Sequence, residues 1–229
     1  MSKDNFIEAR KRTLSHLRDA GIEHHMLHGP ATDSYWSAPL RVLAVNMESY
    51  GYEECGHWDV DLACLLDWMY DRGDTGTKTV RYTLAIIKAL ADAHAANISP
   101  RPQELRTAYA DAKGLEAVLR QTAYYNIRPT SNPQKPEDAA SIVASGSTPL
   151  SDFVRDEMLA LAPHVIFVSG HSGLAAFNAM WHLEPPLRYL DSMRHSCGSV
   201  IQSVRHPSRP NYTAFAGAIS KVLEQLNQA

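Results

Sequence analysis

Three polar residues of this 229-residue sequence lie at or just after the carboxyl ends of short apolar segments and carry side chains that can act on a ligand: Glu48, Asn126 and His206. A carboxylate can stabilise developing positive charge and position a water molecule. A neutral imidazole can donate a hydrogen bond to a developing anion, and an amide offers both a donor and an acceptor. Held together by a fold, these residue types could recognise a polar ligand and cleave one of its bonds.

The apolar segments have the length of buried strands and cover residues 42–45, 122–127, 164–168 and 199–204. We expect helices over residues 4–20, 59–70, 79–96, 103–120, 151–162, 174–182, 187–193 and 213–226, with Ser151 as an N-cap. Alternating strands and helices predict an α/β fold, a three-layer αβα sandwich with a central four-stranded parallel sheet. The polar residues after the strands, His171 and Ser172 included, would then meet at the carboxyl edge of the sheet, where open sheets bind ligands.

The length and composition indicate one globular domain over residues 1–229. Hydrophobic residues make up 45% and charged residues 21% of the chain. Residues 1–39 are expected to form an N-terminal helical extension. Residues 128–150, which contain four prolines, are expected to form a long loop beside the active site.

Charge and cysteine content indicate a cytoplasmic protein. The three cysteines form no CxxC pair, the first residues lack the apolar core of a signal peptide, and no apolar run has the length of a membrane span. The net charge is −3, but four arginines and one acid lie between residues 188 and 212. This local excess predicts a cationic rim beside one end of the sheet.

Two further patterns are weak signs of a binding site. His24, His25 and His28 are clustered, but only Glu23 joins them as a further metal-ligand type, so a solvated loop is the favoured interpretation. The segment 73–79, GDTGTKT, has the wrong glycine spacing for a phosphate-binding loop and follows a predicted helix where a strand is required.

Together, the segments after the predicted strands resemble motifs of the uracil-DNA glycosylase superfamily. The sequence HPSRPN at residues 206–211 is similar to the HPS motif of its single-strand-selective branch. NMESYG at 46–51 resembles the first motif, GQDPYH, without a gap. YNI at 125–127 resembles the strand end that carries the base-reading asparagine, and VSGHS at 168–172 the turn after the third strand. The order of the motifs agrees from about Leu40 to Leu226.

The resemblance implies a DNA glycosylase that flips a pyrimidine out of DNA and hydrolyses its N-glycosidic bond, leaving an abasic site. Glu48 would stabilise the sugar cation and position water, and His206 would stabilise the departing base. The implied base-binding residues are Asn126, Tyr50, Asn46 and Trp58, and the implied DNA-binding residues are Ser208, Arg209, Asn211, Arg205 and Ser172. The implied partner is DNA, with no cofactor, metal or membrane, and the chain is expected to be monomeric.

The segment 46–51 departs from the GQDPYH motif of the superfamily. These departures bear more on which base is removed than on cleavage of the N-glycosidic bond. The acid is glutamate instead of aspartate, which moves the carboxylate by about 1.5 Å at a fixed backbone position. Met47 and Ser49 replace the glutamine and the proline on either side of it. The substrate is therefore expected to be uracil or a modified pyrimidine, in DNA repair or in defence against phage DNA with modified bases.

Two other functions remain open from the residues. Gly170-His171-Ser172 is similar to the start of the nucleophile elbow of α/β serine hydrolases, with Asp191 and His206 following in the acid-then-base order. Leu174, however, stands where that motif requires a glycine. The second alternative is a catalytically inactive DNA- or nucleotide-binding module on the same fold.

Overall fold

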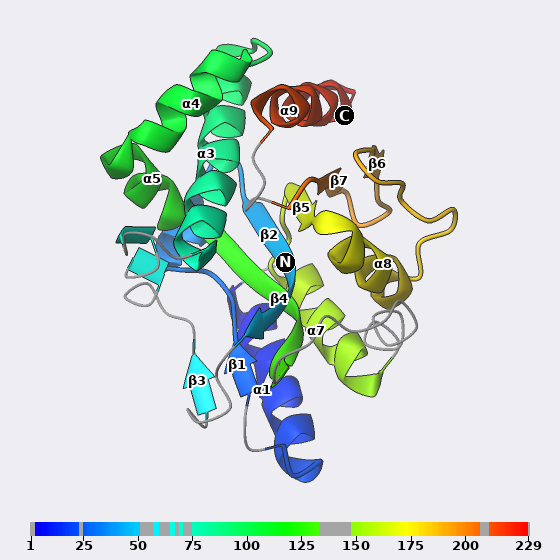
Figure 1. The fold of residues 1–229 in the computed structure, drawn as a ribbon. Coiled ribbons are helices and arrows are strands. Elements are labelled where there is room, and N and C mark those ends of the chain that lie inside the picture. The colour runs from blue at the N-terminus through cyan, green and yellow to red at the C-terminus, as the bar shows by residue number, and fades with distance from the viewer. Residues whose placement is uncertain are drawn as a thin grey trace.

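A five-stranded sheet forms the centre of the computed structural model, which describes residues 3–22, 25–50, 57–59, 65–66, 69–70, 75–132, 148–206 and 211–228 (Figure 1). The strand order is β4 (Thr122–Asn132), β2 (Val42–Tyr50), β5 (Val165–Ser169), β7 (Val200–Val204), β6 (Ser192–Arg194). The first four strands are parallel, and β6 is antiparallel to β7. The prediction of four strands was therefore one strand short, and the helix predicted near residues 187–193 is wrong.

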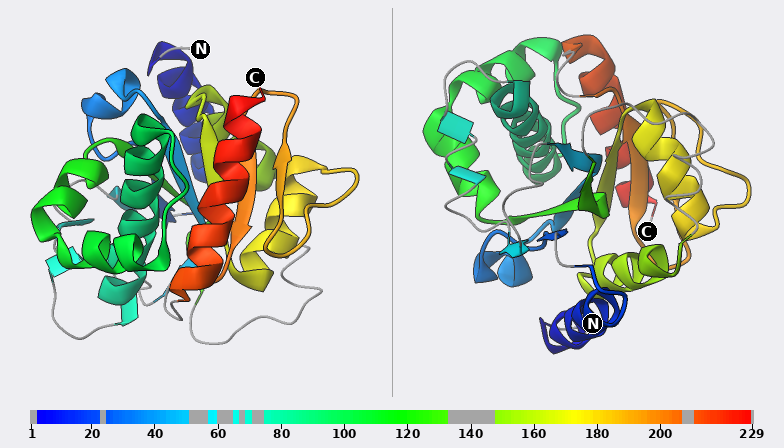
Figure 2. Two further views of the ribbon diagram at one scale, coloured as in Figure 1. Left: turned by 90° about the horizontal axis from the view of Figure 1, so that it is seen from above. Right: turned by 60° about the horizontal axis from the view of Figure 1, so that its bottom comes forward.

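Helices cover both faces of this sheet, which confirms the α/β class and its layers (Figure 2). On one face lie α3 (Thr75–Ala96) and α9 (Tyr212–Asn227), with α4 (Pro102–Ala110) and α5 (Ala112–Leu119) against α3. On the other face lie α7 (Pro149–Ala160) and α8 (Gly170–Trp181), and α1 (Lys3–Asp19) packs on α7. A second, two-stranded sheet pairs β1 (His25–Leu27) with β3 (His57–Asp59), and a 3-10 helix covers Asp33–Ser37.

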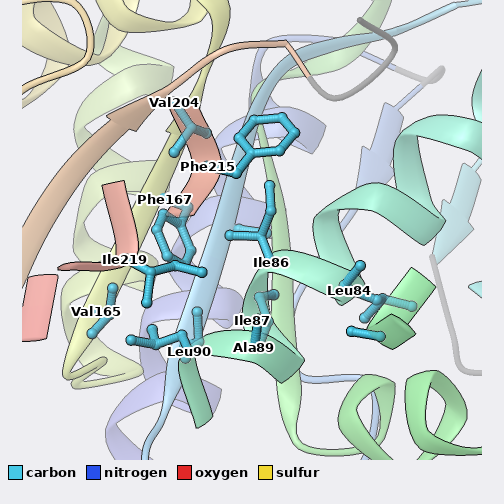
Figure 3. Close-up of a cluster of buried hydrophobic side chains, with 14 of the residues drawn as sticks. Leu84, Ile86, Ile87, Ala89, Leu90, Val165, Phe167, Val204, Phe215 and Ile219 are labelled. Atoms are coloured by element: carbon cyan, nitrogen blue, oxygen red, sulfur yellow. The ribbon is translucent and has the colours of Figure 1, made fainter. Parts of the chain in front are cut away.

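Alternate residues of the strands supply two hydrophobic cores, one on each face of the sheet. Phe167 and Val204 pack with Ile86, Phe215 and Ile219 of α3 and α9 (Figure 3). The opposite face packs its alternate strand residues, such as Val45 and Ile166, against α7 and α8. Because both faces of these strands are buried, their sequences are continuous apolar runs and do not alternate between apolar and polar residues. Each fully buried side chain of this size contributes about 1.5–3 kcal/mol.

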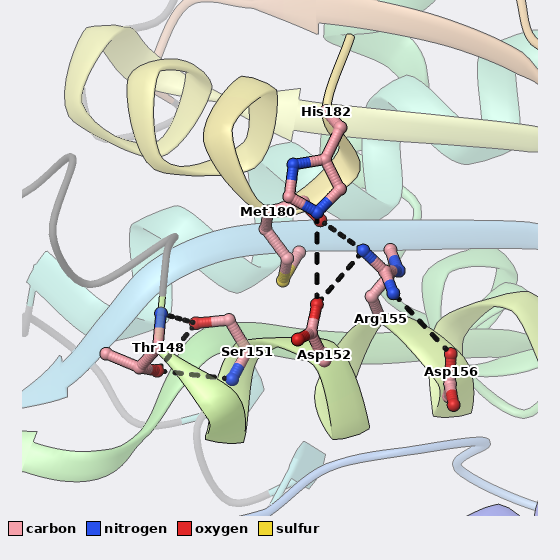
Figure 4. A network of polar contacts seen from close by, with 7 residues as sticks. All are labelled: Thr148, Ser151, Asp152, Arg155, Asp156, Met180 and His182. Carbon is pink, nitrogen blue, oxygen red and sulfur yellow. Dashed lines mark hydrogen bonds and ion pairs between the residues drawn. The ribbon is translucent and has the colours of Figure 1, made fainter.

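Polar contacts join α7 to the C-terminal end of α8 (Figure 4). The N-cap of α7 is Thr148, whose hydroxyl accepts a hydrogen bond from the Ser151 N–H at 3.2 Å, so the prediction of Ser151 as the cap is wrong by one turn. The Arg155 guanidinium donates to the Met180 carbonyl at 3.1 Å and pairs with Asp152 at 3.1 Å. These contacts hold the helix that begins at the carboxyl end of β5.

None of the helices in the described ranges is both long and apolar enough to cross a membrane.

Candidate active site

The paired strands β2 and β4 extend beyond β5, the other neighbour of β2, at the carboxyl edge. Pairing between β2 and β5 ends at Val45 and Val168, whereas pairing between β2 and β4 continues to Tyr50 and Asn132. The predicted strands over 42–45 and 122–127 were therefore too short, and the predicted loop over 128–150 begins as strand. Parallel pairing explains the difference, because it gives the polar backbone of these segments hydrogen-bond partners.

This two-stranded extension carries Glu48, which lies opposite Arg128 in the register and so within β2, not beyond the end of the strand as predicted. The backbone of Tyr50 ends β2, and that of Trp58 lies in β3, paired with Met26. The side chains of Glu48, Tyr50 and Trp58 lie outside the described part, as do Ser208 and Arg209 entirely.

Asn46 and Asn126 lie side by side at the point where the extension begins. They are paired in the register of adjacent parallel strands, so their side chains leave the same face of the sheet. Asn126 is buried, with 8% of its surface exposed. The Oδ1 atom of Asn46 is buried and accepts no hydrogen bond from the described part of the chain. A buried acceptor of this kind costs free energy until a ligand or water donates to it.

His28 is a site residue that the sequence interpretation missed. The predicted solvated loop is wrong for His28, which is 5% exposed and whose Nε2 lies 3.2 Å from the Asn126 Nδ2. Because the amide nitrogen carries only hydrogens, it donates and the ring nitrogen accepts, which favours the neutral Nδ1–H tautomer. His28 and Asn126 are 98 positions apart, and no local pattern indicates their contact.

A buried ion pair supports this contact from the opposite face. Arg10 donates to the Glu157 carboxylate at 2.8 Å, to the Tyr125 hydroxyl at 2.9 Å and to the His28 carbonyl. The Tyr125 hydroxyl also donates to Glu157. Burial lowers the pKa of Arg10, but Tyr125 and Glu157 outweigh it and raise that pKa above its ordinary value. Burial also raises the pKa of Tyr125, so its hydroxyl remains a donor.

His206 reaches the N-terminus of α8 from the end of β7. A Cβ placed on Gly170 would lie 3.6 Å from both Cβ and Cδ2 of His206, so the imidazole packs over this glycine. Gly170 has φ +74°, a left-handed conformation that favours glycine at the strand-to-helix turn. His206 itself is exposed at the carboxyl edge.

The remaining described candidates lie around this position. Ser172 is exposed in the first turn of α8, where His171 stacks on Tyr189 with ring centroids 3.6 Å apart. Arg205 is half-buried, and Asn211 caps α9 by accepting a hydrogen bond from the Ala214 N–H at 3.0 Å. Like His28, Tyr189 lies near the candidate site and was not among the residues predicted from the sequence.

The printed partners of Asp191 do not fit the acid of a hydrolase triad. Its Oδ1 accepts hydrogen bonds from Lys221 at 3.1 Å and from the Ser192 N–H at 3.0 Å. Lys221 first, and the Ser192 N–H second, hold the pKa of this carboxyl below its usual value. Asp191 thus fastens the start of β6 to α9.

Within the described ranges, no three His, Cys, Asp or Glu residues are grouped so that they could hold a metal ion.

The chain was compared with known protein families, curated proteins and solved structures. No protein-family model, curated protein or solved structure gives a significant match to this chain.

Proposed function

We propose that this chain is a DNA glycosylase of the uracil-DNA glycosylase type, which removes uracil or a modified pyrimidine from flipped-out DNA. The observation that carries the proposal is the meeting of four strand ends at one edge. β2 and β4 bring Asn46 beside Asn126, and β5 and β7 bring Gly170 beneath His206. These are the positions that carry the motif resemblance, in the same order along the chain.

The chemistry assigned to the site requires charge stabilisation on both sides of the N-glycosidic bond. Glu48 would stabilise the positive charge that develops on the sugar and would position the attacking water. His206 would donate a hydrogen bond to the carbonyl oxygen of the departing base. The parallel strands that carry these residues are both anchored in the hydrophobic cores, which supports a preorganised site.

Base recognition is assigned to the two paired asparagines. His28 holds one end of the Asn126 amide, which favours a single orientation of its donor and acceptor. The Asn46 Oδ1 lacks a donor in the described part and suits a polar hydrogen of the base or a bound water. Tyr50 and Trp58 would stack against the base, and Ser172, Arg205, Ser208, Arg209 and Asn211 would contact the DNA.

The proposal is tested by incubating the protein with DNAs that each carry uracil or one modified pyrimidine and then cleaving abasic sites with alkali. We expect strand cleavage with at least one of these bases and none with unmodified DNA. Retained DNA binding without any abasic product would instead support an inactive binding module.

The Asn126→Asp variant is expected to change the choice of base. The substitution keeps an oxygen acceptor and removes the amide donor, so a base acceptor loses its partner at a cost of about 1–3 kcal/mol, or roughly 5- to 150-fold in rate. Release of a uracil-type base should fall, and release of a cytosine-type base, which offers an amine, should be spared. Single-turnover rates on both substrates measure the ratio, and an unchanged ratio would assign base reading to another residue.

The Ser172→Ala variant is expected to release the base at nearly the parent rate, because Ser172 is assigned to DNA contact and not to the chemical step. A fluorophosphonate probe should leave the parent protein unlabelled. Covalent labelling that disappears in Ser172→Ala would favour the serine hydrolase instead.

A further inference from the structure

Aromatic and cationic side chains gather where the N-terminal part of α3 meets α4 and the first turn of α9. This cluster, called here the tyrosine–arginine corner, consists of Arg81, Tyr82, Arg106, Tyr109 and Tyr212, together with Lys78, whose charge acts on Tyr109. None of these residues belongs to the site described above, and neither the motifs nor the resemblance assigned them a role.

Two of the rings in the corner are stacked, the third lies tilted beside them, and guanidinium groups lie over two of the rings. Tyr82 stacks on Tyr109 with centroids 4.1 Å apart, and Tyr212 lies 6.0 Å from Tyr82 at a tilt. Arg81 lies over the Tyr109 ring at 4.8 Å, and Arg106 lies over the Tyr212 ring at 5.2 Å. The rings therefore hold two otherwise flexible cations in place by cation–π contact.

Among the described residues, no acid forms an ion pair with a cation of the corner. Within the described ranges, no carboxylate lies within 4.0 Å of Lys78, Arg81 or Arg106 in an ion pair. Lys78 and Arg106 are exposed. Elsewhere on α4 the arrangement is different, because Arg101 pairs with Glu104 at 2.8 Å. Arg106 is thus exposed and held by the Tyr212 ring, Lys78 is exposed, and Arg81 is half-buried and donates to the Tyr109 carbonyl at 3.1 Å. Exposed cations without an ion-pair partner among the described residues favour an anionic partner.

The corner adjoins the proposed active site through α9. Tyr212 is the first residue of α9, only six positions after His206. Since α9 follows β7, its first turn lies at the carboxyl edge of the sheet, and the Tyr82–Tyr212 contact brings α3 to the same end. Phe215, one turn further along α9, lies beside Val204 at the end of β7 (Figure 3).

We infer that the tyrosine–arginine corner binds the phosphate backbone of a single nucleic-acid strand that continues from the site. The identity of the strand rests on the proposed function, whereas the anionic chemistry rests on the corner itself. Arg106 and Lys78 would contact phosphates, and the partly exposed tyrosine rings beside them would face sugars or bases, a combination typical of single-strand binding. An acidic protein segment would use the cations without needing the rings.

The test compares Lys78→Ala and Arg106→Ala with the parent in binding a labelled single-stranded oligonucleotide over a series of salt concentrations. Each lost phosphate contact should reduce the slope of log affinity against log salt by about 0.7 and weaken binding roughly three- to tenfold near 0.1 M salt. Arg101→Ala is the matched control, because it removes the same charge from the exposed N-cap of the same helix, where Glu104 already pairs with it. Its slope should equal that of the parent.

A truncated oligonucleotide that covers only the target nucleotide and its nearest neighbours should bind the parent and Arg106→Ala equally. Parent-like slopes for Lys78→Ala and Arg106→Ala, an equal loss in Arg101→Ala, or tighter capture of a poly-glutamate peptide than of the oligonucleotide would each overturn the inference. Base release by the parent is measured separately. If the parent releases a base but the salt slopes of Lys78→Ala and Arg106→Ala equal that of the parent, the proposed glycosylase activity stands and nucleic-acid binding at the corner is rejected. If these slopes change but no base is released, binding at the corner stands and the glycosylase activity is rejected.

Discussion

Replacement of Glu48 by glutamine is expected to abolish base release while DNA binding remains. The substitution keeps the shape of the side chain and removes its charge, so in the proposed mechanism the sugar cation would lose its stabilising carboxylate in the transition state. Removal of a single preorganised electrostatic group of this kind costs about 10²–10³ in rate. Single-turnover kinetics at saturating enzyme measure the chemical step, and salt-dependent anisotropy measures binding.

Glu224→Gln serves as the control for this experiment, since it makes the same change at an exposed position of α9. It should release the base at the parent rate. A Glu48→Gln protein that is as fast as this control would remove Glu48 from the mechanism. A variant that loses DNA binding and release together would show that Glu48 acts in holding the substrate.

The second large effect is expected from Arg10→Met, which leaves the Glu157 carboxylate buried without its cation. Glu157 is 1% exposed, and one of its oxygens, Oε1, already lacks a hydrogen-bond partner in the described part of the chain. Breaking a buried pair by removing one partner costs about 3–5 kcal/mol in the free energy of unfolding. Denaturant unfolding followed by far-UV circular dichroism measures this loss.

A matched control lies on the same two helices. Arg12 and Asp156 pair at 3.8 Å with side chains that are 60% and 41% exposed, so Arg12→Met should cost less than about 1 kcal/mol. The triple variant Arg10→Met, Tyr125→Phe, Glu157→Leu removes all the buried polar groups together and should regain most of the lost stability. Equal effects of Arg10→Met and Arg12→Met would show that the buried pair contributes no more than an exposed one.

The buried pair also links α1 to Asn126, the residue proposed to read the base. Arg10 binds the carbonyl of His28, whose ring holds Asn126, and Tyr125 is the neighbour of Asn126 in β4. A helix that the sequence suggests is an extension therefore shares a hydrogen-bond network with the site. The ratio of the single-turnover release rates for uracil-type and cytosine-type bases, measured in Arg10→Met, would show whether this network influences the choice of base.

The strands that pack on both faces were the most predictable part of the fold. Residues 165–168 are all buried, and their apolar run was predicted within one residue of β5. The strand β6 was missed because Ser192–Arg194 has no alternating apolar pattern and is held by its pairing with β7. The extension of β2 was missed for the same reason, since its polar residues gain strand structure from β4.

The candidate site was predictable only where its residues follow recognisable strands. Asn126 and His206 could be named because each stands at the end of an apolar segment, and a parallel sheet brings such ends together. His28 and the Arg10–Glu157 pair depend on contacts between distant segments. Charged residues are mostly exposed, so a sequence interpretation places Arg10 and Glu157 on the surface.

The segment that carries His28 also closes one border of the sheet. Residues 29–31 run antiparallel along the free side of β4, with the Ala31 N–H bonded to the Thr122 carbonyl at 3.0 Å and the Tyr124 N–H to the Gly29 carbonyl at 2.9 Å. The opposite border is the three-residue strand β6, which is too short to serve as a template. Along these stretches the sheet resists addition of a foreign strand, which protects the protein from edge-to-edge aggregation.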